Sequence, residues 1–217
     1  MSIDAFLRGI RVLDLSRHLP GPLATLMLAD MGAEILKIES PDGDELRTIG
    51  PPGPSGRSAY FDAVNAGKTS MRLDLHTDSS RGELLKLAEA SDVVVESFRP
   101  GVLERLGVGF DAMRARNPRL VCCSVNGFGH DGPLTAKAAH DINYLALAGT
   151  LNAAGPRLRP MFFYPPVADC AGAIFAVSAI LAALIHRMRT GEACAIDLAL
   201  ADVVMPFQLS SLPISAQ

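Results

Sequence analysis

The chain has little of what marks several common classes of protein. Its four cysteines show neither a CxxC pair nor a zinc-like spacing to histidine: Cys122, Cys123, Cys170 and Cys194. We therefore expect no disulfide framework, no metal site, and a reducing, cytoplasmic location. Cys170 directly follows Asp169, and we expect it to be a small buried thiol rather than a nucleophile.

An excess of positive charge is also missing. The chain has 20 Lys and Arg against 23 Asp and Glu, which gives a formal net charge of −3 at pH 7. This balance predicts no nucleic-acid partner, so any anion site must be local. The opening MSIDAFLRG lacks the basic and apolar pattern of an export signal.

The sequence lacks several catalytic and cofactor fingerprints. After the first predicted strand, the segment SRHLPGP contains neither GxGxxG nor GxxxxGK[ST], and the chain has no GxSxG or HExxH. These absences give no support to a nicotinamide, flavin, P-loop, serine hydrolase or zinc protease function. We expect no prosthetic group.

One long apolar run stands out, from Val167 to Ile185. Its length would suit a marginal membrane span, but it contains Asp169 and many Ala and Gly residues and ends at His186-Arg187. This composition predicts a helix buried inside the protein, with no membrane partner.

Apolar runs with strand and helix periods alternate along the chain, which predicts an α/β fold built on a Rossmann-like open parallel sheet with flanking helices. A segment rich in Pro, Gly and Ser, residues 41–67, is expected to be a long functional loop. The predicted strands are 10–15, 33–39, 70–73, 92–95, 120–125 and 194–198, and the predicted helices are 23–31, 79–90, 103–106, 110–116, 140–149 and 168–188.

Basic residues cluster where predicted strands end. Arg17 and Arg99 each follow a strand directly, as does the turn NGFG at 126–129, and ligands of open α/β sheets bind at this edge. The backbone amides of the NGFG turn either hold a ligand or only reverse the chain. Lys68, Arg105 and Lys137 belong to the same predicted edge.

His140 and Asp169 form a candidate acid/base pair. Histidine titrates near neutrality, and a partly buried aspartate can be tuned toward it. His140 opens a predicted helix and Asp169 lies near the start of the next one. Two different proton carriers indicate proton-transfer chemistry.

Three ordered motifs carry a resemblance to a known family. These are GIRVLDLSRHLPGPLATLMLADMGAEILKIESPDGD, NAGKTSMRLDL and DVVVESFRPGVLERLGVGFDAMRARNPRLVCCSVNGFGHDGP. Together they resemble the class III coenzyme A transferases, the family that also contains α-methylacyl-CoA racemase. The resemblance covers essentially the whole chain and implies a large domain over residues 1–199, with 200–217 starting a linker toward a small domain that is absent.

The resemblance implies that coenzyme A, as part of the substrate, lies along the strand ends. Arg17 and His18 match the turn near the adenosine, and Lys137 matches a further ligand-facing lysine. Asn65, Lys68 and Arg105 match positions that face the nucleotide and its phosphates. Ser40 stands where a basic residue often occurs, so Arg47 is a candidate replacement.

Two chemistries follow from the resemblance. HDINYLALAG is similar to the racemases, in which His140 and Asp169 face opposite sides of the acyl α-carbon; the segment FFYPPVADCAG favours a transferase, in which Asp169 attacks the thioester. We take α-methylacyl-CoA racemase-type proton transfer as the main prediction because His140 supplies the titratable group that it requires.

The family assembles as interlocked dimers, so we expect a homodimer or a complementing C-terminal half. An inactive, truncated CoA-binding fragment is the third hypothesis.

Overall fold

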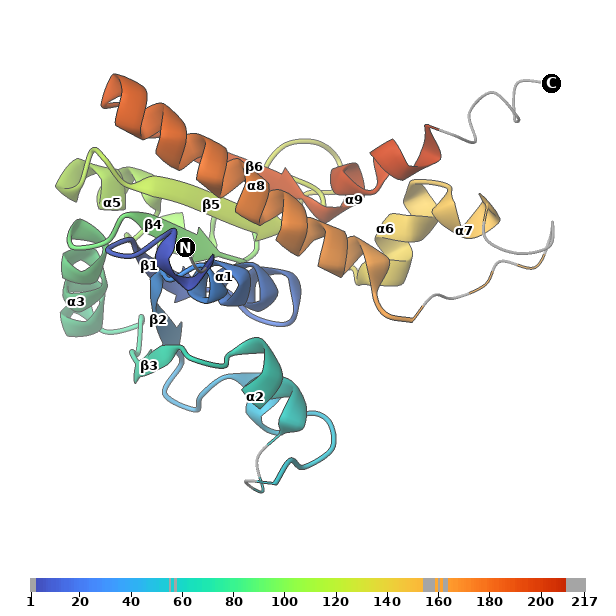
Figure 1. Cartoon of the computed structure of the whole chain (residues 1–217), viewed down its shortest axis with the longest axis horizontal. Coiled ribbons are helices and arrows are strands. Elements are labelled where there is room, and N and C mark those ends of the chain that lie inside the picture. Colours follow the sequence, from blue (N-terminus) through green and yellow to red (C-terminus); the bar gives the residue numbers. More distant parts are fainter. Residues whose placement is uncertain are drawn as a thin grey trace.

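Six parallel strands form a single sheet at the centre of the fold (Figure 1). The computed structural model describes residues 3–54, 56, 58–153, 159, 161 and 164–209. The sheet order is β3-β2-β1-β4-β5-β6, and every neighbouring pair is parallel. This confirms the predicted Rossmann-like sheet. The strands are β1 (Arg11–Leu15), β2 (Glu34–Glu39), β3 (Thr69–Arg72), β4 (Val93–Glu96), β5 (Val121–Asn126) and β6 (Ala195–Ala199).

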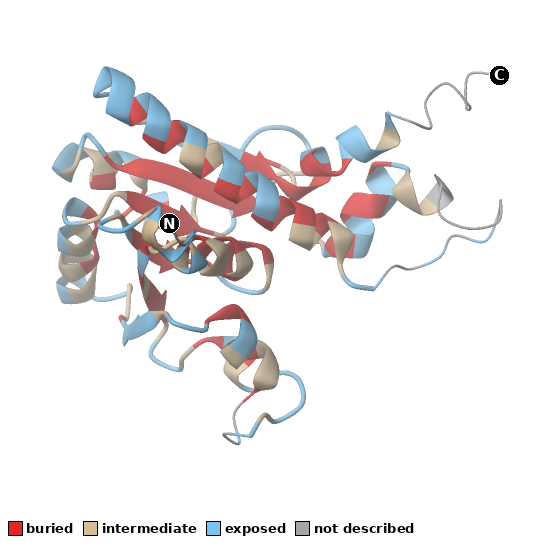
Figure 2. Ribbon diagram, viewed as in Figure 1, coloured by how far each residue is buried: buried red, intermediate tan, exposed pale blue. Residues whose placement is uncertain are grey.

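Helices cover both faces of the sheet. Along β4, Val93 and Val95 join the apolar core that contains α1 (Pro20–Asp30) and α8 (Val167–Thr190), whereas Val94 joins the core on the opposite face. That second core includes residues of α3 (Asp78–Glu89) and α5 (Phe110–Arg116). Because side chains of a strand alternate between faces, an unbroken apolar strand suits a sheet that is covered on both sides. Figure 2 shows the buried sheet between helices with exposed outer surfaces.

The segment expected as a long loop contains structure of its own. Within residues 41–67 lie a 3-10 turn, Glu45–Arg47, and the helix α2 (Ala59–Val64). The Ser58 hydroxyl accepts a hydrogen bond from the Phe61 amide at 3.2 Å, which caps α2. Phe61 packs with two other buried residues, Val64 and Leu46. The Pro, Gly and Ser content concealed this helix because its 6 residues leave too little periodicity to detect.

The other short elements connect the layers. They are Ile3–Ala5, α4 (Val102–Arg105), α6 (Asp141–Leu147), α7 (Thr150–Ala153), α9 (Leu200–Val203) and Met205–Gln208. α9 follows β6 directly, and Leu200 and Val204 are buried in the core that contains α8. The predicted division of the chain between residues 199 and 200 stays a prediction.

The apolar helix α8 packs on the sheet as the sequence predicts. Its length and composition would suit a membrane span, but half of its most apolar window is buried inside the domain. At its C-terminal end, the Arg187 guanidinium is buried and donates to the Asp92 carboxylate at 3.0 Å and to the Arg119 carbonyl at 3.0 Å. This arrangement is typical of a core helix anchored at its end.

The start of α1 tests how tightly the turn after β1 is packed. A Cβ on Gly21 would lie 2.2 Å from the Ser16 Cβ, so Gly21→Ala must displace backbone. We expect this substitution to lower the free energy of unfolding by about 1 to 3 kcal/mol. Gly82→Ala is the matched control, because nothing lies within 4 Å of that Cβ and alanine favours a helix. Urea denaturation measures the stability of both variants. Equal unfolding midpoints for Gly21→Ala and Gly82→Ala would contradict tight packing of the turn after β1.

Candidate functional site

A cavity of about 350 Å³, which we term the switch-point cavity, opens at the carboxyl ends of β1, β4 and β5. The strand order reverses at β1, since β2 and β3 lie on one side and β4 to β6 on the other. Open α/β sheets bind ligands at such a reversal. Six predicted site residues line this cavity: Arg17, His18, Arg99, Lys137, His140 and Asp169.

Asp169 lies in the first turn of α8 and is half-buried. Burial and, to a smaller extent, the nearby negative charge of Asp141 raise the pKa of its carboxyl to about 6, although His140 opposes both effects. A carboxylate whose pKa lies this close to neutrality is more basic than an exposed one and is a typical active-site group. Above about pH 6 the group is mostly ionised.

His140 reaches the same cavity from another element. It is the N-cap residue of α6, and its backbone amide donates to the Asn143 side-chain oxygen at 2.9 Å. Its ring is exposed and lies edge-on to the ring of His18, with 6.5 Å between their centroids. His18 Nε2 in turn lies 3.3 Å from the Glu45 carboxylate. The structure thus brings His140 and Asp169 to one cavity, as predicted.

Asp141 is a site residue that the sequence analysis missed. Its buried carboxylate accepts hydrogen bonds from the backbone amides of Ala168 at 2.6 Å and Asp169 at 3.1 Å. These amides belong to the first turn of α8, where backbone N–H groups have no partner within the helix, so Asp141 caps that helix from α6. The only available signal was its position beside His140, which gives no hint of a partner 27 residues away.

Two tyrosines also surround Asp169. Burial, followed by the charge of Asp169, raises the pKa of both phenols, and that of Tyr144 reaches about 12. Tyr144 donates its hydroxyl proton to the Ala139 carbonyl at 3.0 Å. Tyr60 comes from α2, within the segment that was expected to be a loop. Burial likewise raises the pKa of Cys170, which lowers the thiolate fraction that a nucleophile requires.

The turn after β5 is held by side chains. Asp197 of β6 accepts from the Asn126 amide group at 2.7 Å and from the His130 backbone amide at 2.8 Å, and Asn126 accepts from Gly129. The Gly129 and His130 amides are therefore engaged internally. GFGHDG also fits the letters GxGxxG, but the next helix begins only at Asp141, so the turn lacks the helix N-terminus that a dinucleotide site needs.

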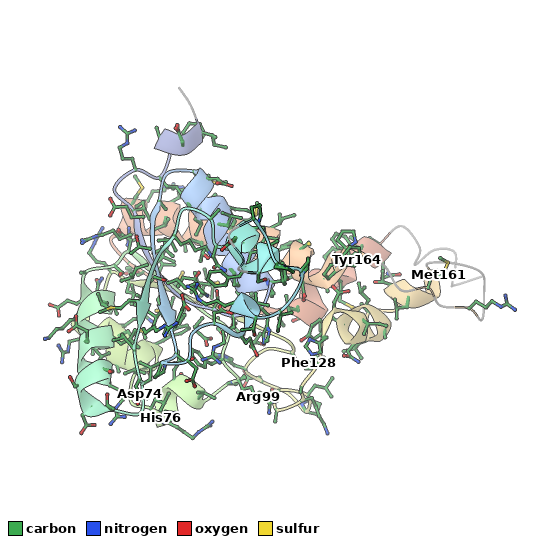
Figure 3. The ribbon with its side chains drawn as sticks, turned by 90° about the horizontal axis from the view of Figure 1, so that it is seen from below. Asp74, His76, Arg99, Phe128, Met161 and Tyr164 are labelled. Atoms are coloured by element: carbon green, nitrogen blue, oxygen red, sulfur yellow. The ribbon has the colours of Figure 1, made fainter. Side chains whose placement is uncertain are left out.

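A second hollow of about 320 Å³, the edge cavity, lies at the ends of β1, β2 and β3. Arg17 and Phe98 line both cavities, and the Arg17 guanidinium lies 5.5 Å from the Phe98 ring centroid. In Figure 3 the labelled Asp74 and His76 of the edge cavity and Arg99 and Phe128 of the switch-point cavity follow one another along one edge. Arg105 lines the edge cavity.

Two predicted ligand-facing residues line neither of these cavities. The Asn65 side chain is buried and accepts a hydrogen bond from Lys68, whose ammonium is enclosed inside the domain.

Arg47 is not a replacement for the missing basic residue at Ser40. Its guanidinium is paired with the buried Glu39 at 2.6 Å and lies over the Phe61 ring at 3.9 Å. Hydrogen bonds from Arg47 and Asp44 hold the pKa of Glu39 below its usual value despite the opposing effect of burial.

The sheet and its two adjoining cavities, which share Arg17 and Phe98 and which we together term the groove, define a Rossmann-like domain. The chain belongs to CoA-transferase family III, whose family model matches residues 7–215. It is 42% identical over 205 residues to a succinate–glutarate CoA-transferase of Agrobacterium fabrum, which covers 91% of this chain and 51% of that protein. It is 39% identical over 202 residues to an acetyl-CoA:oxalate CoA-transferase of Acetobacter aceti, which covers 92% of this chain and 52% of that protein.

A solved structure shares the fold closely. The crystal structure of a CAIB/BAIF family protein from Brucella suis has a TM-score of 0.93 and 37% identity, over 98% of this chain and 58% of that chain. This chain spans about half the length of the curated relatives it matches. These relatives are named as transferases, which favours the transferase alternative over the racemase prediction.

Replacing Asp169 tests its environment. Since the pKa of the folded state lies above that of an unfolded aspartate, folding favours the protonated group, and wild-type stability falls as pH rises from about 4 to 6. Asp169→Asn removes this penalty. We expect urea denaturation to show a gain of about 1 to 3 kcal/mol at pH 8 that narrows toward pH 4. A gain independent of pH would contradict the raised pKa.

Asp141→Asn separates capping from charge. The variant keeps an oxygen for the two α8 amides but removes the negative charge that raises the pKa of Asp169. We expect the Asp169 pKa, followed by carbonyl ¹³C NMR, to fall below about 6, and we expect Asp141→Ala to cost about 1 kcal/mol of stability through the lost cap. An unchanged pKa in Asp141→Asn would show that burial alone sets the value.

Proposed function

We propose that this protein takes part in the transfer of coenzyme A between carboxylic acids, with Asp169 as the nucleophile. The observation that carries this proposal is the half-buried Asp169 carboxylate, which lines the switch-point cavity with its pKa raised to about 6. Membership of CoA-transferase family III and relatives named as CoA-transferases support the same chemistry.

We propose that coenzyme A occupies the two cavities together. We place its nucleotide in the edge cavity beside Arg105, and the pantetheine arm past Arg17 and Phe98, which the two cavities share. The thioester then lies in the switch-point cavity near Asp169. Arg99 and Lys137 also line that cavity with exposed cationic groups suited to phosphate or carboxylate oxygens.

The proposed reaction begins with attack of an Asp169 oxygen on the thioester carbonyl carbon. The carbon–sulfur bond breaks, the CoA thiolate leaves, and a mixed anhydride remains. The thiolate then attacks the aspartyl carbonyl, which releases the donor acid as its carboxylate and leaves CoA on Asp169 as a thioester. The acceptor carboxylate repeats the sequence in reverse and regenerates the Asp169 carboxylate, with no net change in protons or electrons.

Ionisation of Asp169 is the requirement for the first step. A protonated carboxyl is a poor nucleophile, and burial holds the pKa near 6 rather than at the ordinary value of 3.8. The group is therefore ionised at neutral pH, yet it is more basic than an exposed aspartate. Cations that line the cavity, such as Arg99, are suited to stabilise negative charge that develops on the carbonyl oxygen.

Racemase-type proton transfer is the second candidate, because His140 lines the same cavity as Asp169. One group would remove the α-proton of the acyl thioester and the other would return a proton to the opposite face. In the transferase mechanism the His140 imidazole carries out no chemical step.

The exposure of His140, Arg17 and Arg99 indicates that the groove is open on one side. We propose that further polypeptide, from a second copy or a complementing half, covers it and excludes water during the reaction. A cytoplasmic location remains part of this proposal. The chain by itself would then bind CoA but turn over slowly or not at all.

One experiment distinguishes the transferase mechanism from the racemase mechanism. We would incubate the protein with succinyl-CoA and look by peptide mass spectrometry for CoA held as a thioester on Asp169, sensitive to hydroxylamine. We expect the adduct in wild type, in His140→Ala and in the control Asp111→Asn, which alters an exposed acid of α5. We expect none in Asp169→Asn.

A parallel incubation with a 2-methylacyl-CoA in deuterated water tests the other reading by proton NMR. Deuterium at the α-carbon, lost in both His140→Ala and Asp169→Asn, together with no adduct, would establish proton transfer and overturn the transferase proposal. CoA binding with neither product would mean that the chain alone is an incomplete site.

A further inference from the structure

The turn after β1 carries Arg17 and His18 into the groove, and its conformation needs support. His18 has a φ of 62°, in the left-handed region that few residues other than glycine adopt. Such a conformation persists only where the surroundings fix it. The Arg17 amide donates to the Ser97 hydroxyl at 2.8 Å, which is one such support.

Lys68 supplies a second support, from the connection between α2 and β3. Its side chain is 1% exposed, and its ammonium has four oxygen atoms within 3.1 Å. These belong to the end of β1, the first turns of α1 and the end of α2: Asp14, Pro22, Thr25 and Asn65. An ammonium has only three protons to donate, so it is fully occupied and has none left for a phosphate.

Lys37 holds the other end of the same turn. From β2, its buried ammonium donates to the Ser16 carbonyl at 2.8 Å and pairs with the Asp44 carboxylate at 2.9 Å. Asp14 accepts from the Ser16 amide at 2.9 Å. The two lysines therefore hold both ends of the turn: Lys37 donates to the Ser16 carbonyl, and Lys68 donates to the Pro22 carbonyl.

The charges in this cluster balance locally. Burial would raise the pKa of Asp14, but Lys68 and Lys37, with hydrogen bonds from Ser16 and Thr25, hold it below the usual value. Burial lowers the pKa of Lys68, and Asp14 opposes that effect. Each charge depends on the others, so removal of one leaves another buried without its partner.

We propose that Lys68 is a positioning residue: it holds the turn from Ser16 to Pro22 so that Arg17 and His18 face the ligand groove, and it does not contact the ligand. This inference rests on the proposed function, since that function makes coenzyme A the ligand. It replaces the direct nucleotide contact that the family resemblance implies for Lys68.

The test uses a pair of compensating substitutions. Lys68→Met alone leaves Asp14 buried with too little positive charge and is expected to destabilise the fold, so the informative variant is Lys68→Met with Asp14→Asn. Hydrogen exchange should rise at the amides of residues 16–23 and stay unchanged in α8. Affinity for coenzyme A, measured by calorimetry, should fall about tenfold.

The ratio of affinities for coenzyme A and dephospho-coenzyme A distinguishes positioning from contact. In the double variant we expect this ratio, and the dependence of affinity on salt, to match wild type, whereas Arg105→Gln, which alters a cation in the edge cavity, should reduce both. Asp14→Asn alone is the matched control, because Asp14 itself accepts from the Ser16 amide, and exchange at residues 16–23 should be lower in it than in the double variant. Lys86→Met, which alters an exposed lysine of α3, should change nothing.

Each outcome has one meaning. A reduced affinity ratio in the double variant would show a phosphate contact and overturn the proposal, as would unchanged exchange at residues 16–23. If wild type fails to bind coenzyme A, the proposed function fails, and the exchange measurement still decides whether Lys68 holds the turn.

Discussion

The bond between the Asp141 carboxylate and the first turn of α8 sets the geometry on which the candidate chemistry depends. Asp141 is the immediate neighbour of His140, and its carboxylate accepts a hydrogen bond from the backbone amide of Asp169 at 3.1 Å. One side chain therefore ties together the two chain segments that carry the candidate catalytic groups. Because the same carboxylate is negatively charged, it also raises the pKa of the residue it positions. Asp141 thus both positions Asp169 and adds to the effect of burial on its pKa.

Buried polar groups concentrate at the end of the sheet where the ligand groove lies. β1, β2, β4 and β5 are apolar over much of their length, yet Asp14, Glu39, Glu96 and Asn126 are buried near their carboxyl ends. Burying such groups costs free energy unless hydrogen bonds satisfy them. Cations pair with two of these groups, Lys68 with Asp14 and Arg47 with Glu39, while the exposed Arg17, Arg99 and Lys137 remain available to the cavity. Burial separates the supporting charges from those that can meet a substrate.

The sequence predicted the sheet well because β1, β2, β4 and β5 are apolar over much of their length and the turns are marked by glycine and proline. It also predicted that Arg17, His18, Arg99, Lys137, His140 and Asp169 share a site, and all six line one cavity. The sequence was less informative about which cations are paired with buried acids and which face the cavity. Lys68 pairs with Asp14, 54 residues away, and Arg47 pairs with Glu39, eight residues away across a loop, and neither spacing belongs to a regular helix or strand pattern. The capping role of Asp141 was hidden for the same reason, since its partners belong to another helix.

Whether Asp169 acts on the carbonyl carbon or on the α-carbon depends on how the thioester is seated rather than on the carboxylate itself. A raised pKa makes the group a stronger base and, among carboxylates, a stronger nucleophile, so the environment of Asp169 serves either reaction. The two reactions differ in what they need opposite it. Proton transfer requires a second titratable group across the α-carbon, whereas acyl transfer requires donors that stabilise a carbonyl oxygen as it gains charge. The exposed ring of His140 is linked through His18 to the turn that Lys68 and Lys37 hold, which makes its position sensitive to whatever closes the groove. Under the proposed function, closure of the groove would therefore determine which atom of the acyl group meets Asp169.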